Sequence, residues 1–270
     1  MRSRRGNRAA MPVVRLLQRS YFMLLKTKKQ LLEKDEQGFL FWKALIKEEE
    51  FFPGKCAVII CDMWDRHWSP AATLRAAAMA PVLNGYIAAM RDEGMTIIHC
   101  PSETLDFYEG HPARIRMNKI LDYCTKKQLR EVKRKVRAAK YPSHPLDARR
   151  GGCDTGGRTP KNYLVWSRQN ADIYIDGDRD FIGEKYAEVY NIMKHRDLDT
   201  LIYTGVHTNM CVIGREFGMK NMAQSGFKVY IAANATDAMY CPADRPYVSH
   251  ERGVEMCVEY IEKFIGESVF

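Results

Sequence analysis

Short, continuous apolar runs alternate with amphipathic stretches along this chain. Four runs have the length and β-branched character of strands buried on both faces of a parallel sheet. They are CAVIIC at 56–61, MTIIHC at 95–100, TLIYTGV at 200–206 and KVYIAA at 228–233. The interval between the second and third runs is too long for one crossover, so we predict a further strand, NYLVW, at 162–166.

Helical periodicity fills the intervals between these runs. Apolar residues recur at helical spacing over 79–90 and Gly94 follows as a stop signal, which predicts a helix. The same spacing predicts a helix over 186–193, and we expect others over about 211–226 and about 248–265. Strands that alternate with amphipathic helices predict an α/β fold with a doubly wound sheet.

The 270 residues are assigned to one domain and an extension. We place a basic N-terminal extension at 1–50 and the domain at 51–270. An insertion at about 120–160 holds a basic helical stretch at 126–140 and a loop rich in Pro and Gly. We interpret the insertion as a lid over the site. The basic helix is interpreted as a solvated face, with an anionic partner as the alternative.

The net charge of +9 is concentrated at the N-terminus. Of the 42 basic residues, nine lie within 1–29 without any acidic residue, and the other 33 balance 33 acidic residues. We interpret this arm as a solvated tail, with a targeting presequence or a nucleic-acid-binding arm as the alternatives. No apolar stretch approaches the roughly 18 residues of a membrane span. We therefore expect a soluble, cytoplasmic protein without a membrane partner.

The cysteines and glycines exclude two classes of protein. None of the eight cysteines forms a C-x-x-C pair, which excludes a zinc ribbon and favours reduced thiols in an intracellular protein. No G-x-G-x-x-G follows the first run, so a dinucleotide-binding dehydrogenase is not supported.

Chemically active residues follow the carboxyl ends of the predicted strands, where parallel sheets bind ligands. Asp62, Arg168 and Cys211 follow three of these strands. A cation and a helix N-terminus favour the thiolate, and a carboxylate can move a proton from the thiol to a leaving amine. We predict that these three are catalytic and that N–H groups of the turn from Val206 through His207 to Cys211 bind an oxyanion. Other polar residues at the same edge are Asp65, His67, His99, Ser102, Glu103 and Asp237.

Two motifs resemble the isochorismatase-like cysteine hydrolases, a family that includes nicotinamidases. IICDMW is similar to the family's catalytic-aspartate strand, and GVHTNMCV is similar to its nucleophile turn, Gly-Val-x-Thr-Asn-x-Cys-Val. The second motif is the more specific, and the resemblance covers about 53–265. It implies a three-layer α/β/α sandwich with a mainly parallel sheet, Asp62 as base, Cys211 as nucleophile, a cis peptide between Val206 and His207, and a homo-oligomer.

Two positions depart from the family pattern. The family's third catalytic residue is a lysine at the end of the third strand, where this chain offers Arg168, with Lys161 as the nearest alternative. Arginine can hold a charge near a thiolate but cannot transfer a proton, because its pKa lies above about 12. Trp64 stands where many members have Gln, so we expect Trp64, His67 and His207 to line the substrate pocket.

The family's nicotinamidases hold a metal through an Asp-x-His pair and another histidine. That pair follows the family's second strand, where the HCPSE of this chain lacks it. Asp65 and His67 have the spacing but follow the first strand, and with His99 on the adjacent strand they could converge on a divalent metal. The alternative is that these residues line the pocket or are hydrogen-bonded within the structure. The predicted chemistry itself requires no cofactor.

These features predict a cysteine-dependent hydrolase that acts on a non-peptide C–N bond of a small amide. Its expected partners are a small-molecule substrate and further copies of the chain. A non-catalytic binding or scaffold member of the same fold is the main alternative. A nucleic-acid-associated protein that acts through the basic arm is the less favoured one.

Overall fold

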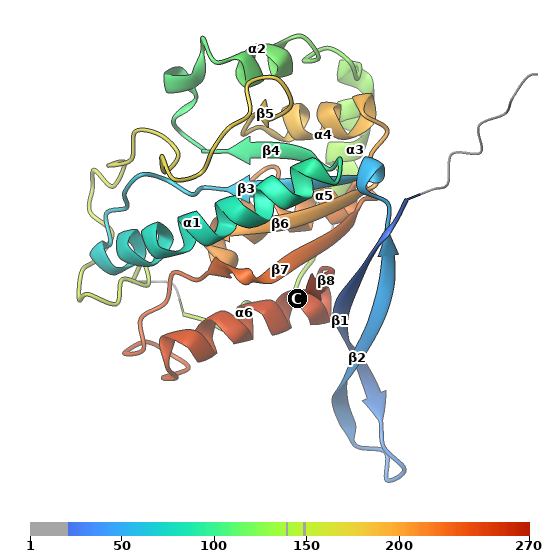
Figure 1. The fold of residues 1–270 in the computed structure, drawn as a ribbon. Helices are drawn as coiled ribbons and strands as arrows, with labels where there is room; N and C mark the ends of the chain where they lie inside the picture. The colour runs from blue at the N-terminus through green and yellow to red at the C-terminus, as the bar shows by residue number, and fades with distance from the viewer. Residues whose placement is uncertain (1–20, 139, 148–149) are drawn as a thin grey trace, which may run out of the picture.

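An eight-stranded sheet with helices on both faces forms the centre of the protein (Figure 1). The computed structural model describes residues 21–138, 140–147 and 150–270. The strand order is β2-β1-β8-β7-β6-β3-β4-β5, and every neighbouring pair from β8 to β5 is parallel. This architecture confirms the predicted three-layer α/β/α fold with a mainly parallel sheet. The strands are β1 Met23–Lys34, β2 Leu40–Phe51, β3 Cys56–Cys61, β4 Thr96–Cys100, β5 Phe181–Ile182, β6 Thr200–Val206, β7 Lys228–Asp237 and β8 Glu267–Val269.

The helices divide between the two faces of the sheet. Long α1 covers one face, and α4, α5 and α6 pack against the other. A hydrophobic core lies on each face of the sheet, and alternate residues of β3 contribute to one or the other. Val58 and Ile60 pack on the α1 side, and Ala57 and Ile59 pack on the opposite side. Burial on both faces explains why this strand is apolar without interruption. The helices are α1 Pro70–Asp92, α2 Pro112–Asn118, α3 Lys126–Ala138, α4 Tyr186–His195, α5 Met219–Gln224 and α6 His250–Phe264. Among the described residues, no helix is both long and apolar enough to cross a bilayer.

The predicted strand at 162–166 is wrong. Tyr163 and Leu164 are exposed in a loop, while the Trp166 ring stacks on Trp64 at a centroid distance of 4.0 Å. The edge position beside β4 belongs instead to β5, only two residues long. The apolar run at 162–166 therefore supplies one aromatic anchor rather than a sheet strand.

The predicted helix over 211–226 is interrupted. A π-helical turn occupies Thr208–Val212, and α5 begins only at Met219. Gly218 lies in the tight turn between them, where a Cβ atom would come within 2.9 Å of the backbone of Arg215. Cys211 is thus part of a short turn and does not open a long helix.

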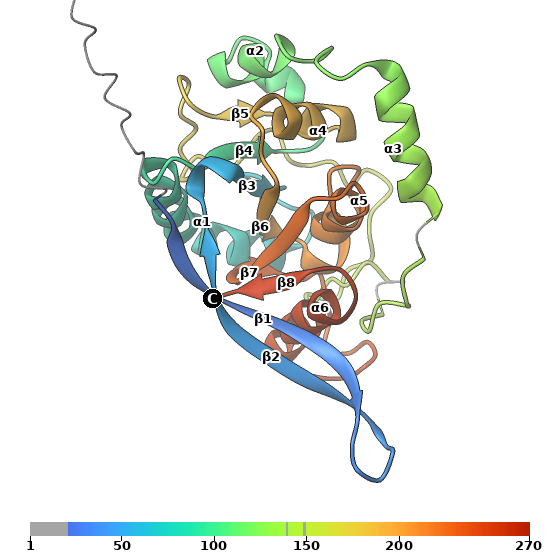
Figure 2. The same cartoon turned by 90° about the vertical axis from the view of Figure 1, so that its right-hand side faces the viewer.

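The N-terminal extension folds in part, where no strand was predicted. Strands β1 and β2 form an antiparallel hairpin, and β1 joins the sheet where Thr27 and Lys28 pair with β8. The rest of the hairpin projects away from the sheet (Figures 1 and 2). The first 20 residues, which hold most of the basic arm, lie outside the described residues. Helix α3 agrees with the basic helical stretch predicted in the insertion.

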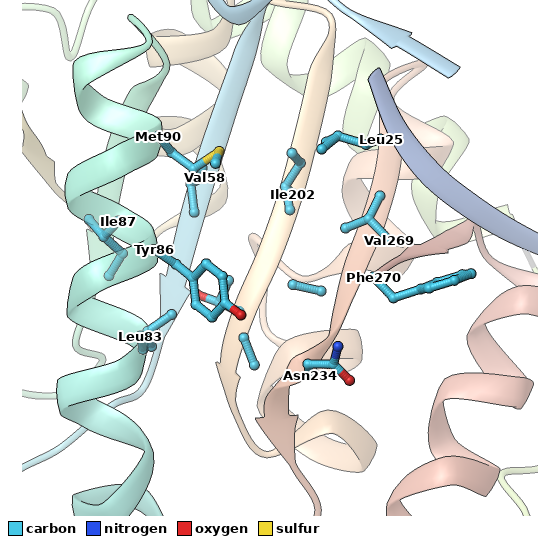
Figure 3. Close-up of a pocket in the computed structure, with 13 residues that line it drawn as sticks. Leu25, Val58, Leu83, Tyr86, Ile87, Met90, Ile202, Asn234, Val269 and Phe270 are labelled. Carbon is cyan, nitrogen blue, oxygen red and sulfur yellow. The ribbon is translucent and has the colours of Figure 1, made fainter. Parts of the chain in front are cut away.

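An apolar groove lies on the α1 face, between that helix and strands β6, β7, β8 and β1 (Figure 3). Its walls include Leu25, Tyr86, Ile202 and Val269. None of the residues that line it carries a charge, a thiol or an imidazole. The chemistry of the protein must therefore be sought at the carboxyl edge of the sheet.

Candidate active site

Asp62 occupies the first position after β3 and is fully buried. The backbone N–H of Ser102, which follows β4, donates to Asp62 Oδ1 at 2.9 Å. The backbone N–H of Asp62 in turn donates to the carbonyl of Cys100 at 3.0 Å. Asp62 is also one of the few non-glycine residues with a positive φ, 46°. Two neighbouring strand ends thus fix this carboxylate at the predicted edge of the sheet.

The turn that carries Cys211 follows β6, the strand beside β3. Gly205 has a φ of 92°, and a Cβ atom there would lie 2.2 Å from the carbonyl oxygen of Cys61. Only glycine allows β6 to approach β3 so closely at this point. The peptide bond between Val206 and His207 is cis, as the family resemblance implies.

The thiol of Cys211 and the carboxylate of Asp62 lie close enough for each to shift the pKa of the other. Burial and the negative charge of Asp62 raise the pKa of Cys211, while Arg215 and the N–H of His207 oppose that shift. Burial also raises the pKa of Asp62. The sequence argument that a helix start lowers the pKa of Cys211 is therefore wrong, and the resting thiol is protonated.

Arg215 provides the cation of this site, and sequence analysis did not identify it. Its Nε donates to Asp62 Oδ2 at 3.1 Å, and its two terminal nitrogens lie 3.3 and 3.4 Å from the carboxylate of Glu103. Arg215 follows Cys211 by four residues. This helical spacing was the only sequence feature that could have placed its side chain near the thiol. Arg215 was not expected because it lies within the predicted helix and not directly after a strand.

The structure does not bring Arg168 to the Asp62–Cys211 pair. Its guanidinium lies over the ring of Phe107, 5.6 Å from the centroid, and the side chain is exposed. Its carbonyl accepts a hydrogen bond from the N–H of Asp65, which ties this segment to the chain after β3. Because the expected strand before Arg168 does not form, the residue never reaches the carboxyl edge in the predicted way.

Aromatic rings form a wall beside the Asp62–Cys211 pair. The indoles of Trp64 and Trp166 are stacked, and the His67 ring lies 5.5 Å from Trp166 and 5.0 Å from His207. Trp64 Nε1 donates to the carbonyl of Ser102 at 3.0 Å, which joins this wall to the residue that holds Asp62. The structure thus groups the three predicted pocket residues and adds Trp166.

Both histidines of this wall are neutral near pH 7. Burial and the nearby charge of Arg75 lower the pKa of His67 to about 4. Burial and the neighbouring His67 lower the pKa of His207 to about 3. His207 Nε2 and Trp166 Nε1 are buried and have no hydrogen-bond partner among the described residues. These two atoms can therefore bind polar groups of a ligand.

The insertion reaches the same edge of the sheet. Cys153 packs with Met210, the neighbour of Cys211. Asp154 accepts a hydrogen bond from Arg75 at 2.6 Å, and Arg75 also donates to Asp237, the polar residue at the end of β7. Asp237 is further paired with His250 at 2.7 Å. Ion pairs and the contact with Met210 therefore hold part of the insertion beside the turn that carries Cys211.

The candidate metal ligands do not converge. Asp65 binds the backbone and hydroxyl of Ser167, and His67 Nδ1 accepts from the N–H of Ser69. His99 belongs to a separate buried network with Gln169 and Asp180. Within the described part of the chain, no group of three or more His, Cys, Asp and Glu side chains is arranged to hold a metal ion. These residues do not fit the metal site expected from the resemblance.

The fold and the site together define an α/β protein with a buried aspartate, a partly buried cysteine and an arginine at the carboxyl edge of its sheet. No family model matches the chain, and no curated protein matches it in sequence. Two solved structures show low similarity. One is an isochorismatase family protein from Desulfovibrio vulgaris subsp. vulgaris str. Hildenborough, with 15% identity over 77% of this chain and 89% of that chain, and a TM-score of 0.42. The other is an Isochorismatase family protein from Burkholderia thailandensis, with 12% identity over 68% and 79%, and a TM-score of 0.37. Function must therefore be argued from the residues of the site.

Proposed function

We propose that this protein is a cysteine-dependent hydrolase of a small amide or related non-peptide C–N substrate, with the site of the isochorismatase-like family. The pairing of β3 with β6, which sets the Cys211 thiol beside the buried Asp62 carboxylate, carries the proposal. A nucleophile already in contact with its base is the arrangement that covalent catalysis requires. Arg215 adds a fixed positive charge next to both groups.

The first half of the reaction transfers the acyl group to Cys211. The thiol gives its proton to Asp62 as the sulfur attacks the substrate carbonyl carbon. The N–H groups of His207 and Cys211 stabilise the oxyanion that forms. Asp62 then protonates the leaving nitrogen, the C–N bond breaks, and an amine or ammonia departs from a thioester.

The second half regenerates the thiol. Asp62 accepts a proton from a water molecule that attacks the thioester, and the C–S bond breaks to release a carboxylic acid. The proton returns from Asp62 to the sulfur. Arg215 moves no proton, because its pKa is too high, and it stabilises whichever of Asp62 and Cys211 is negative at each stage.

The aromatic wall sets the kind of substrate that fits. The stacked rings of Trp64 and Trp166 form a rigid aromatic wall, and Trp166 Nε1 and His207 Nε2 have no hydrogen-bond partner among the described residues. This combination supports a small, planar molecule with polar edges. The part of the insertion around Cys153 closes the side next to Met210, which supports its proposed role as a lid.

A panel of small amides and ureides tests the proposal through release of ammonia or amine. We expect turnover of at least one compound, and a loss of about a thousandfold or more in Cys211→Ala and in Asp62→Asn. Cys241→Ala is the matched control, because Cys241 is a partly exposed thiol outside the site. Equal activity in Cys211→Ala would refute the proposed mechanism.

The main alternative is a binding or scaffold protein without catalysis. The absence of a lysine from the Asp62–Cys211–Arg215 set favours it, since arginine cannot take part in proton transfer. An inactive protein that is nevertheless stabilised by members of the panel in a thermal-shift assay would support this alternative. Loss of that stabilisation on Trp166→Ala would place the ligand at the same wall.

A further inference from the structure

The outer edge of strand β2 ends the sheet without a partner strand among the described residues. β2 is 12 residues long, pairs with β1 without a bulge, and has ten exposed residues. Proteins usually shorten, bulge or cover such an edge, because its free N–H and C=O groups pair readily with another strand. This edge is neither short, bulged nor covered, and its charges are of both signs, with Lys43 and Lys47 followed by three glutamates at 48–50. Apolar side chains are exposed along it as well, among them Phe41, Leu45 and Ile46.

From this edge we infer that β2 pairs antiparallel with β2 of a second copy of the chain, which joins two sheets into one. Two identical strands that pair this way are related by a two-fold axis, and the residue on the axis faces its own copy. Pairing over nearly the whole of β2 places the axis at Leu45 or at Ile46. The charges along the strand decide between these two registers.

An axis at Leu45 would place Lys43 of each copy opposite Lys47 of the other. That register creates two like-charge pairs, which destabilise a sheet. An axis at Ile46 instead places Lys43 opposite Glu49 of the second copy, twice, and brings the two Ile46 side chains together. The strand is therefore self-complementary about Ile46.

The ends of the strand fit the same register. With the axis at Ile46, Leu40 at the hairpin tip stands opposite Phe52 of the second copy, just beyond the base of β2. Both side chains are exposed in the single chain, 62% and 41% respectively, and the backbone at Phe52 is extended. The hairpin projects beyond the rest of the fold, which leaves the outer edge of β2 open (Figures 1 and 2). Pairing would give the projecting hairpin support that an isolated two-stranded ribbon lacks.

The mass of the full chain in solution, measured by light scattering and sedimentation, is the first test. We expect a dimer. Lys43→Glu or Glu49→Lys alone should weaken dimerisation by about tenfold or more, because two attractive pairs become repulsive. The double variant Lys43→Glu/Glu49→Lys should bind more tightly than either single variant, although it also loses the ion pairs of Lys43 with Glu33 and of Glu49 with Lys47 within each chain. Lys29→Glu is the matched control, since this exposed charge lies on the inner strand β1.

A cysteine placed on the axis tests the register itself. Under mild oxidation Ile46→Cys should form a disulfide-linked dimer, and Leu45→Cys should not. Both residues are exposed, so neither change should unfold the chain, and melting temperatures verify this. A disulfide in Leu45→Cys alone would overturn the register.

Three results would overturn the interface. The first is a monomer at every concentration reached. The second is a dimer whose affinity is unchanged in Lys43→Glu and in Glu49→Lys but which dissociates in Tyr86→Lys. That result would place the contact at the apolar groove of Figure 3. The third is a dimer lost on deletion of residues 1–20, which would assign the contact to that segment.

Discussion

At the scale of single residues, Asp62 controls the state of Cys211. Burial and the negative charge of this carboxylate raise the pKa of the thiol. The proton can leave sulfur only when something else stabilises negative charge there. In the proposed mechanism that condition arises as the bound carbonyl is attacked.

Removal of the Asp62 charge should make Cys211 more reactive toward simple alkylating agents. Asp62→Asn lowers the pKa of the thiol, so iodoacetamide should modify Cys211 at pH 7 about tenfold faster or more, while hydrolysis is lost. Intact mass with a Cys211→Ala control identifies the labelled residue. Slower alkylation in Asp62→Asn would contradict this electrostatic account.

Loss of Arg215 should reduce kcat/KM, whereas loss of Arg168 should leave it nearly unchanged. Arg215→Gln removes the positive charge that opposes the raised pKa values of Cys211 and Asp62, so alkylation should slow and kcat/KM should fall by about a hundredfold. Arg168→Gln, the matched control, removes an exposed guanidinium stacked on Phe107 and should change kcat/KM by less than about threefold. The reverse ranking would restore the role first predicted for Arg168.

The pH dependence of hydrolysis follows from the raised pKa of Asp62. A base must be unprotonated to accept a proton, so activity should fall as pH decreases through a value above the ordinary 3.8 of aspartate. A kcat/KM profile between pH 4 and 8 measures this limb. Full activity maintained at pH 4 would exclude Asp62 as the base.

At the scale of elements, the sequence predicted the helices and strands whose buried residues recur at regular spacing. Strands β3 and β6 were located at their observed bounds, and α1, α4 and α6 at their observed places, because both-face burial and helical spacing leave clear patterns. The hairpin was missed because the faces of β2 are largely exposed, so no alternation marks it. Strand β5 was missed because a strand of two residues is too short to show a hydrophobic periodicity. Arg215 was missed because the turn after Cys211 is not a regular helix.

A buried ion pair should hold the segment before β5. Arg91 of α1 donates to Asp180 at 2.9 and 2.7 Å, and His99 lies 3.0 Å away on the other side. Asp180→Ala leaves Arg91 buried without this partner, so the free energy of unfolding should fall by about 3–5 kcal/mol. Chemical denaturation measures this. Asp178→Ala, an exposed aspartate two residues earlier, should cost less than about 0.5 kcal/mol.

The contribution of Asp180 should also depend on pH. Burial raises its pKa, but the hydrogen bonds from His99 and Arg91 outweigh this and lower it to about 2. A depressed pKa means that the stabilisation is complete above the ordinary 3.8 and is lost as pH falls through about 2. The difference in unfolding free energy between wild type and Asp180→Ala should therefore shrink between pH 4 and 2. A constant difference would contradict the ion-pair explanation.

At the scale of the whole molecule, the basic arm and the candidate site are separate in sequence. Every residue of the proposed mechanism lies beyond residue 60, while six arginines lie within residues 1–20. Deletion of 1–20 lowers the net charge from +9 to +3. We expect this deletion to leave kcat/KM within about twofold and to abolish any salt-sensitive binding to nucleic acid. A large loss of hydrolysis would show that the arm contributes to the site.

A protonated Cys211 thiol should resist oxidation while no substrate is bound. Peroxide oxidises thiolates far faster than thiols, and the first product, a sulfenic acid, would end nucleophilic attack. A cysteine that keeps its proton beside Asp62 until a substrate arrives is shielded from this damage while the site is idle. In the proposed mechanism, the contact with Asp62 that delays attack on the substrate therefore also preserves Cys211 under oxidative stress.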